Sequence, residues 1–245
     1  MNKKVKISVL LPTRGRFTVF KNSVESLLDT CDDVNNFEIL LAMDNDDVDT
    51  VRETEEYIKS KDNIRLFLCE RHHYLNLNNY YNELSEKSIG DSLFLWNDDA
   101  IMESGGWDNI IIKEHEKFCV ISPKVSNMEH YWNTQGVLFP IIPRKWFDLT
   151  GSWSYVQAAD SWIDILSKRL GILHNVGEIS ISHDRYDLTG NNHDTTYTEG
   201  RSGVGISKGG WEIKIEEHYE KLNTYMKTLD QDFISSWGMD INYAK

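Results

Sequence analysis

The chain has 245 residues, 40% of them hydrophobic, so it is long enough for one large α/β domain or two small ones with a sizeable core. Its 26 Lys and Arg residues are outnumbered by 39 Asp and Glu residues, which gives a net charge of −13 at pH 7. That charge excludes broad non-specific binding to nucleic acid or to an anionic membrane, because both need a basic surface.

The three cysteines, Cys31, Cys69 and Cys119, are far apart and fit neither a zinc site nor a disulfide framework. No stretch of the sequence is long and apolar enough to span a bilayer, and Pro12 interrupts the short apolar run near the N-terminus. We therefore expect a cytoplasmic protein without a membrane span.

Strand and helix patterns alternate at short spacing through the first half of the chain. Apolar, β-branched runs predict strands, and apolar residues at helical spacing predict the helices between them. The strands are expected at residues 5–11, 37–43, 63–69 and 91–96, and the helices at residues 17–30, 48–60 and 76–87. Alternation of this kind gives a parallel sheet with right-handed crossovers.

The second half of the chain is less regular. We expect helices at 108–117, 158–170 and 211–229, strands at 118–122 and 179–182, an apolar stretch at 137–142 and a loop at 189–210. There is no internal repeat and no low-complexity linker. The simplest arrangement is one α/β domain, with a mostly parallel central sheet flanked by helices and a decorated C-terminal half.

Acidic residues follow two of the expected strands. The apolar run 93–96 stops at Asn97-Asp98-Asp99, and the second strand ends in the acidic cluster 44–47. The carboxyl ends of parallel strands share one sheet edge, which is where open α/β sheets bind ligands. Adjacent carboxylates repel each other, and Mg²⁺ or Mn²⁺, which also brings phosphates, is the usual remedy. The alternative interpretation is a polar turn after a strand.

The order of these features resembles the GT-A glycosyltransferases, in particular the family 2-like group. The resemblance rests on five segments in register: ISVLLPTRGR at 7–16, EILLAMDNDD at 38–47, LNLNNYYNEL at 75–84, LFLWNDDAIM at 93–102 and QAADSWIDILSKRLG at 157–171. It implies a single Rossmann-like GT-A domain over 1–245. Residues 1–105 would form the nucleotide-binding half, and residues 106–245 the acceptor-binding half with a C-terminal loop and helix.

The resemblance also implies roles for individual residues. Nucleoside binding falls to Pro12, Thr13, Arg16 and Asp44, although Asp44 also suits a helix N-cap and Arg14 and Arg16 a solvated surface pair. Asp99 would bind the cation, and Asp98 would touch ribose or the metal. Asn97 occupies the position of the family's first acid. His183 is the candidate third ligand, with His193 as its competitor and a structural histidine as the alternative.

Two further features concern catalysis and the diphosphate. Asp160 matches the family's catalytic base, which takes the proton of the acceptor hydroxyl. Asp164 is the alternative base, and a helix N-terminal acid is the structural interpretation of Asp160. Arg201 and Lys208 lie in a Gly-rich stretch at 200–210 of a kind that often closes over a diphosphate, or is simply a solvated loop.

These expectations combine into a metal-dependent, inverting glycosyltransferase that uses Mn²⁺ or Mg²⁺ and a nucleotide-sugar donor, a UDP-sugar by family habit. The acceptor is a glycan, a protein, a small molecule or a hydroxymethylated DNA base; the basic pairs 144–145 and 168–169 are the candidates for a local DNA-binding patch. The competing hypotheses are a nucleotidyltransferase, disfavoured by the single Gly in PTRGRF, and a non-catalytic binding module. Four tryptophans are candidates for stacking on sugar, with burial as the default: Trp107, Trp132, Trp146 and Trp153.

Overall fold

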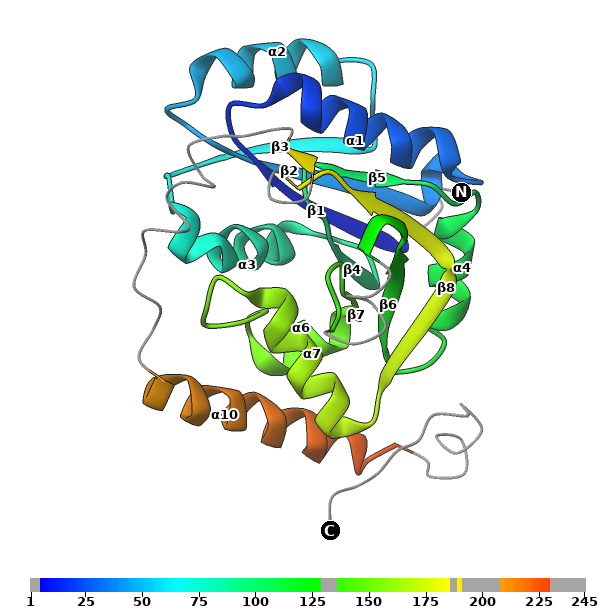
Figure 1. Cartoon of the computed structure of the whole chain (residues 1–245), viewed down its shortest axis with the longest axis vertical. Coiled ribbons are helices and arrows are strands. Elements are labelled where there is room, and N and C mark those ends of the chain that lie inside the picture. Colours follow the sequence, from blue (N-terminus) through cyan, green and yellow to red (C-terminus); the bar gives the residue numbers. More distant parts are fainter. Residues whose placement is uncertain (1–4, 129–135, 186–188, 191–207, 230–245) are drawn as a thin grey trace.

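The computed structural model describes residues 5–128, 136–185, 189–190 and 208–229, and for residues 208–211 it describes the backbone alone. The described residues form one eight-stranded sheet with the strand order β3-β2-β1-β4-β7-β6-β8-β5 and helices on both faces (Figure 1). This is the α/β class that the sequence predicts. No helix within these residues is both long enough and apolar enough to cross a membrane.

The first half of the chain builds the parallel part of the sheet. Its strands are β1 (Ile7–Thr13), β2 (Phe37–Asp44), β3 (Ile64–Cys69) and β4 (Ser92–Leu95), and β1 lies between β2 and β4. Every neighbouring pair among these strands is parallel. β1 and β2 are almost wholly buried, as expected for parallel strands that helices cover on both faces.

Alternate residues of β1 face the two helical layers. Ile7, Val9 and Leu11 pack with α1 (Phe17–Thr30), while Leu10 packs with α3 (Leu77–Lys87). Helix α2 (Val48–Ile58) lies beside α1 on the first face (Figure 1). Helix α4 (Trp107–Glu114) adds Trp107 and Ile111 to the same core. Because β1, β2 and β4 are parallel, their carboxyl ends lie together on one edge of the sheet.

The second half continues the same sheet with mixed directions. Its strands are β5 (Ala100–Met102), β6 (Val120–Val125), β7 (Ile141–Pro143) and β8 (Leu173–His183). The pairs β4–β7, β7–β6 and β5–β8 are antiparallel, and β6–β8 is parallel. All three antiparallel pairs thus involve the half of the chain whose sequence pattern is irregular.

Several boundaries in the second half differ from the prediction. β5 and the helix α6 (Arg144–Thr150) were not expected, and β8 begins at Leu173 rather than at residue 179. The register of β8 against β6 jumps between Val176 and Ser180, so residues 177–179 form a bulge. That bulge, together with the polar residues before it, hides the period of two that would mark a strand.

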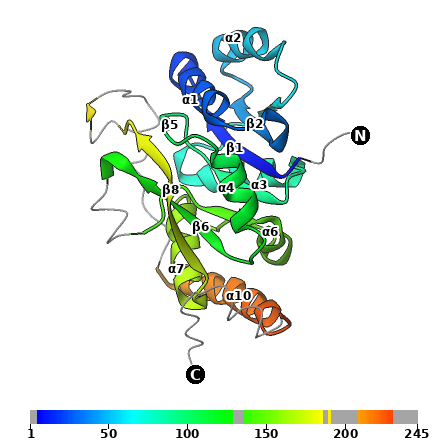
Figure 2. The same ribbon diagram turned by 90° about the vertical axis from the view of Figure 1, so that its right-hand side faces the viewer.

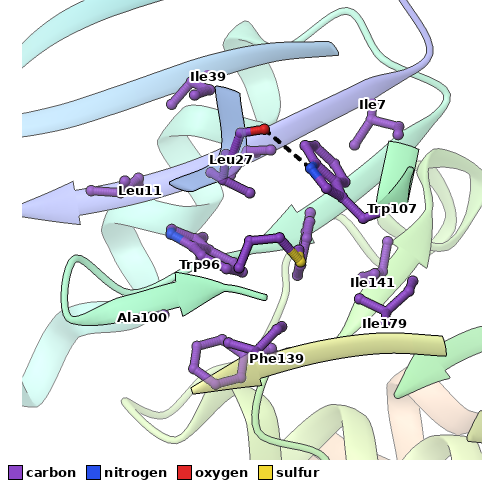
Figure 3. Close-up of a cluster of buried hydrophobic side chains, with 14 of the residues drawn as sticks. Ile7, Leu11, Leu27, Ile39, Trp96, Ala100, Trp107, Phe139, Ile141 and Ile179 are labelled. Atoms are coloured by element: carbon purple, nitrogen blue, oxygen red, sulfur yellow. Dashed lines mark hydrogen bonds between the residues drawn. The ribbon is translucent and has the colours of Figure 1, made fainter. Parts of the chain in front are cut away.

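The aromatic core fixes the end of β4 (Figure 3). Trp96 follows β4 directly, is fully buried, and donates from Nε1 to Ser23 Oγ at 2.7 Å. Its ring lies 5.6 Å from that of Phe139, and Trp107 Nε1 donates to the Leu27 carbonyl at 3.2 Å. Burial of Trp107, Trp146 and Trp153 removes them as sugar-stacking residues, and Trp132 lies outside the described residues.

Helix α10 (Lys208–Met226) packs against α6 and α7 (Ala159–Leu170) on the face opposite α1 (Figures 1 and 2). His218 is fully buried in this contact. Its Nδ1 accepts from Trp162 Nε1 at 3.1 Å, and its Nε2 lies 3.3 Å from Ser152 Oγ. Burial, assisted by the charge of Lys221, lowers the pKa of His218 to about 4. An imidazole that accepts a hydrogen bond must stay unprotonated, so docking of α10 depends on neutral His218.

We expect acid to loosen this contact. The unfolded chain binds a proton at His218 near pH 6.5, whereas the folded chain does so only near pH 4, so stability falls as the pH decreases between these values. Between pH 8 and pH 5, this residue lowers the free energy of unfolding by about 2 kcal/mol. Urea unfolding of His218→Gln, whose amide also offers an acceptor, is expected to show a shallower pH dependence than the original chain. The same pH dependence of the unfolding free energy in both proteins would contradict this role of His218.

Candidate active site

A cavity of about 420 Å³ opens at the carboxyl ends of β1, β2 and β4, the edge where the sequence predicts a ligand site. Asp44, Asp99 and Asp160, which are far apart in the sequence, all line it. Among the residues predicted for the site, eight line this single cavity: Pro12, Thr13, Arg16, Asp44, Asp98, Asp99, Asp160 and His183.

The remaining candidates are not part of the cavity as described. His193 and Arg201 lie outside the described residues, and Lys208 is the first residue of α10, where only the backbone is described. Asp164, the alternative base, is committed elsewhere: its carboxylate accepts from the Val137 N–H at 3.2 Å and pairs with Lys168 Nζ at 2.8 Å. Asp160 is therefore the better placed of the two acids.

Asp44 lines the cavity as the last residue of β2 and is 2% exposed. Its Oδ2 accepts from Arg14 Nη1 at 2.8 Å and lies 4.0 Å from Arg71 Nε, and its Oδ1 accepts from the Tyr80 hydroxyl. Arg14 also forms a two-pronged pair with Asp46. Each carboxylate oxygen has two acceptor positions, so Asp44 retains capacity for a further donor.

Asp98 holds the turn after β1 in place. This carboxylate is 3% exposed and accepts from Thr13 Oγ1 at 2.7 Å and from Arg16 through two nitrogens, with Nε at 3.1 Å. Asp98 therefore fixes the geometry of the segment that carries Thr13 and Arg16. The surface-pair alternative for Arg14 and Arg16 is wrong, because both guanidinium groups pair with acids at the cavity wall.

Asp99 and His183 form a hydrogen-bonded pair at the cavity wall. His183 Nε2 donates to Asp99 Oδ1 at 2.9 Å, and Arg16 Nη1 lies 3.9 Å from Asp99 Oδ2. Burial alone raises the pKa of Asp99, but the hydrogen bond from His183 and the nearby positive charges outweigh it, so the net pKa is below the usual value. Asp99 is therefore ionised over the ordinary pH range.

The backbone of His183 is held from both sides by one amide. Asn127 Nδ2 donates to the His183 carbonyl at 2.9 Å, and the His183 N–H donates to Asn127 Oδ1 at 3.0 Å. The Phe139 ring packs against the imidazole at 4.9 Å. The other ring nitrogen, Nδ1, is buried without a hydrogen-bond partner among the described residues. The imidazole is thus fixed with Nε2 directed at Asp99.

Asp160 lies in the first turn of α7, where the helix dipole favours a carboxylate. Its Oδ1 accepts from the Ser161 N–H at 2.7 Å. Burial raises its pKa, and this hydrogen bond and the charge of Arg185 only partly oppose the effect. A carboxylate with a raised pKa is a stronger base than one in water.

Other cavity residues were not predicted for the site. Six of them come from the loop after β3 and from α3: Arg71, His73, Tyr74, Leu77, Tyr80 and Tyr81. His73 has φ 59 and ψ 167, a conformation that is otherwise almost confined to glycine and that costs about 1–3 kcal/mol. The position of basic Arg71 after a strand was the available signal, because that is the same sheet edge.

The side chains of the two basic pairs proposed as a DNA-binding patch each contact another residue of the chain. Arg144 donates to the Gly90 carbonyl at 2.6 Å and to Ser88, and Lys145 lies over the Tyr225 ring. Lys168 pairs with Asp164, and Arg169 pairs with Glu216. These four side chains do not form a patch that is reserved for phosphates.

Comparison with solved structures identifies the class of fold. The chain is similar to S. aureus TarS 1-349 in complex with UDP-GlcNAc, with a TM-score of 0.58 and 11% identity over 95% of this chain and 78% of that one. It is also similar to the mannosyltransferase PcManGT from Pyrobaculum calidifontis in complex with GDP-Man and Mn2+, with a TM-score of 0.62 and 9% identity over 96% and 79% of the two chains. The fold is that of the GT-A glycosyltransferases.

Sequence comparison then gives the family. Residues 8–157 match the family described as glycosyl transferase family 2, and this match covers more than half of the chain. The chain therefore belongs to glycosyl transferase family 2. No curated protein matches it in sequence.

We expect Arg16→Ala to destabilise the protein by about 3 kcal/mol, because it leaves buried Asp98 without its cation. Urea unfolding measures the loss. Lys6→Ala is the matched control: it breaks a pair whose side chains are 43% and 49% exposed, and it should cost less than about 1 kcal/mol. The double variant Arg16→Ala with Asp98→Asn should recover part of the stability. Equal effects of the two single variants would contradict a structural role for the Arg16–Asp98 pair.

Proposed function

We propose that the protein transfers a sugar from a UDP-sugar to an acceptor hydroxyl, with the help of a divalent cation and with inversion at the anomeric carbon. The observation that supports this most strongly is that Asp44, Asp99, His183 and Asp160 line one cavity in a chain of glycosyl transferase family 2. In this proposal Asp44 binds the nucleoside, Asp99 and His183 hold the cation at the diphosphate, and Asp160 acts on the acceptor hydroxyl.

The surroundings of Asp44 favour uracil as the base. Uracil presents an acceptor, a donor and a second acceptor along one edge, so its complement is a carboxylate beside cationic donors. Asp44 supplies that carboxylate, and Arg14 and Arg71 lie 2.8 and 4.0 Å from its Oδ2. Guanine presents one acceptor and two adjacent donors, and one of those donors would meet a guanidinium. The two solved relatives bind UDP-GlcNAc and GDP-Man, so the family fold itself allows either base.

The residues present fit a divalent cation. Asp99 and His183 offer a carboxylate oxygen and an imidazole nitrogen that are 2.9 Å apart at the cavity wall. Within the described residues there is no group of three His, Cys, Asp or Glu side chains that could hold a metal alone. Such a pair suits Mn²⁺ or Mg²⁺, which keeps waters and takes phosphate oxygens as its other ligands. When bound, the cation would stabilise the charge of the departing diphosphate.

The chain's own residues supply the rest of the reaction. Asp160 takes the proton of the acceptor hydroxyl while that oxygen forms a bond to the anomeric carbon, and the bond from this carbon to the diphosphate oxygen breaks. Arg16, held by Asp98, adds positive charge close to Asp99. Arg185 at the same cavity offers a planar, two-pronged cation for phosphate oxygens.

Charge favours an acceptor hydroxyl on a glycan, a protein or a small molecule over one on a hydroxymethylated DNA base. The protein is acidic overall, and the basic pairs at 144–145 and 168–169 are engaged within the fold. A glycan, a protein or a small molecule is compatible with this charge. Membership of family 2 favours sugar transfer over nucleotidyl transfer.

A thermal-shift titration tests the donor. UDP with Mn²⁺ at about 100 times its Kd should stabilise the protein by about 2.7 kcal/mol, and GDP should give much less. Asp99→Ala should remove the part of the stabilisation that requires Mn²⁺, because the cation loses its carboxylate. Asp49→Ala, which removes a side chain that is 87% exposed, is the control and should behave as the original chain. Equal stabilisation by UDP and GDP would contradict the uracil assignment.

Asp160→Asn tests the catalytic base. We expect the rate of UDP release from a UDP-sugar to fall about 10²–10⁴-fold, because the amide cannot accept the proton. The Kd for UDP should stay within about twofold. Since burial raises the pKa of Asp160, the original enzyme should lose activity on acidification at a higher pH than an ordinary aspartate would give, as the base becomes protonated. An unchanged rate in Asp160→Asn would exclude it as the base.

A further inference from the structure

Two consecutive residues of α3 reach into the site and contact different strand ends. The Tyr80 hydroxyl donates to Asp44 Oδ1, and the Tyr81 hydroxyl donates to Asn97 Oδ1 at 3.0 Å. Both side chains are buried, at 8% and 2% exposure. Neither contact follows from any motif in the sequence, and neither residue is assigned a role in the reaction described above.

The topology explains why adjacent residues diverge. β1 lies between β2, which ends at Asp44, and β4, which precedes Asn97, so the two targets are about 10 Å apart across the sheet. Consecutive helix residues point about 100° apart. Helix α3 packs beneath β1 and β2, and from there Tyr80 turns to one side and Tyr81 to the other.

Tyr80 fixes the nucleoside end. Its hydroxyl accepts from the His72 N–H at 2.9 Å while it donates to Asp44, and Arg14 holds the other oxygen of the same carboxylate. The plane of Asp44 is therefore set from both sides. The His72 ring packs against Tyr80 at 4.7 Å, and its Nε2 contacts Glu83 at 2.7 Å, so the loop after β3 is tied to the same hydroxyl.

Tyr81 fixes the diphosphate end. Because its hydroxyl donates to Asn97 Oδ1, the amide nitrogen of Asn97 is the atom that faces His183, at 3.4 Å from Nε2. Asn97 therefore presents an N–H donor, rather than an oxygen, on this side of the cavity. An amide at position 97 adds no negative charge beside Asp98 and Asp99.

We propose that Tyr80 and Tyr81 are separate positioning residues, Tyr80 for the nucleoside through Asp44 and Tyr81 for the diphosphate through the Asn97 amide N–H. This inference rests on the proposed function. Recognition of the nucleotide sugar is thereby divided between two hydroxyl groups. Removal of the Tyr80 hydroxyl should weaken nucleoside binding alone, and removal of the Tyr81 hydroxyl should weaken diphosphate binding alone.

The test compares two probes, uridine alone and inorganic pyrophosphate with Mn²⁺, by calorimetric or NMR titration. In Tyr80→Phe the Kd for uridine should rise about tenfold, as expected for loss of a hydrogen bond to a charged group, and the Kd for pyrophosphate with Mn²⁺ should stay within about twofold. In Tyr81→Phe the pattern should be reversed. Tyr57→Phe, which removes a hydroxyl from a ring packed against Phe17 and Phe20, should change neither.

The outcomes separate the possibilities. Equal weakening of both probes in either variant, or no weakening, would overturn the proposal, because a merely structural tyrosine has no preference between them. Both affinities come from one preparation, so a partly folded sample lowers both stoichiometries and leaves the ratio of Kd values intact. Should Tyr81→Phe fail to fold, Asn97→Ala breaks the same bond from the other side and should give the same selective loss. If the original chain binds neither probe, the proposed function fails and this inference with it.

Discussion

Four carboxylates line one cavity, and basic side chains beside them balance most of their negative charge. Asp44, Asp98, Asp99 and Asp160 would repel one another if left alone in a partly buried space. Three of them form an ion pair with a basic residue: Asp44 with Arg14, Asp98 with Arg16 and Asp99 with His183. These basic residues come from the turn after β1 and from the end of β8, so charge balance ties the first and last strands of the described sheet to the site.

The same balance gives three of these acids different environments, which suit the roles proposed for them. Asp98 accepts from two side chains and is nearly inaccessible, which makes it a support for the β1 turn. Asp99 is kept ionised by His183 and Arg16, as a cation ligand must be. Asp160 stands apart, with burial that raises its pKa, as a proton acceptor requires. Environment rather than residue type separates these roles.

Much of this arrangement could be predicted from the sequence. Apolar strands that end abruptly in acids placed Asp44 and Asp99 at one sheet edge, because parallel strands all end on the same side. Asp160 followed from the family resemblance at the start of α7. Resemblance also suggested His183, although spacing alone could not, since β8 pairs with β5 and β6 and brings His183 to Asp99 only through the folded sheet.

Other parts could not be predicted, for physical reasons. β5 is three residues long, and the bulge in β8 removes the alternation that marks a strand. Tyr80 and Tyr81 lie on a helical face whose pattern indicates core packing, and only the positions of β2 and β4 on either side of β1 reveal their polar contacts. The loop that contains His73, with its positive φ, is held by a tertiary contact, because the His72 N–H donates to the Tyr80 hydroxyl.

The most direct test of the account is a crystal structure of the protein with UDP and MnCl₂, with the cation located by its anomalous scattering. The account predicts a Mn²⁺ peak about 2.0–2.3 Å from an Asp99 carboxylate oxygen and from His183 Nε2, with diphosphate oxygens as further ligands and uracil at Asp44. A cation bound elsewhere, or uracil away from Asp44, would contradict it.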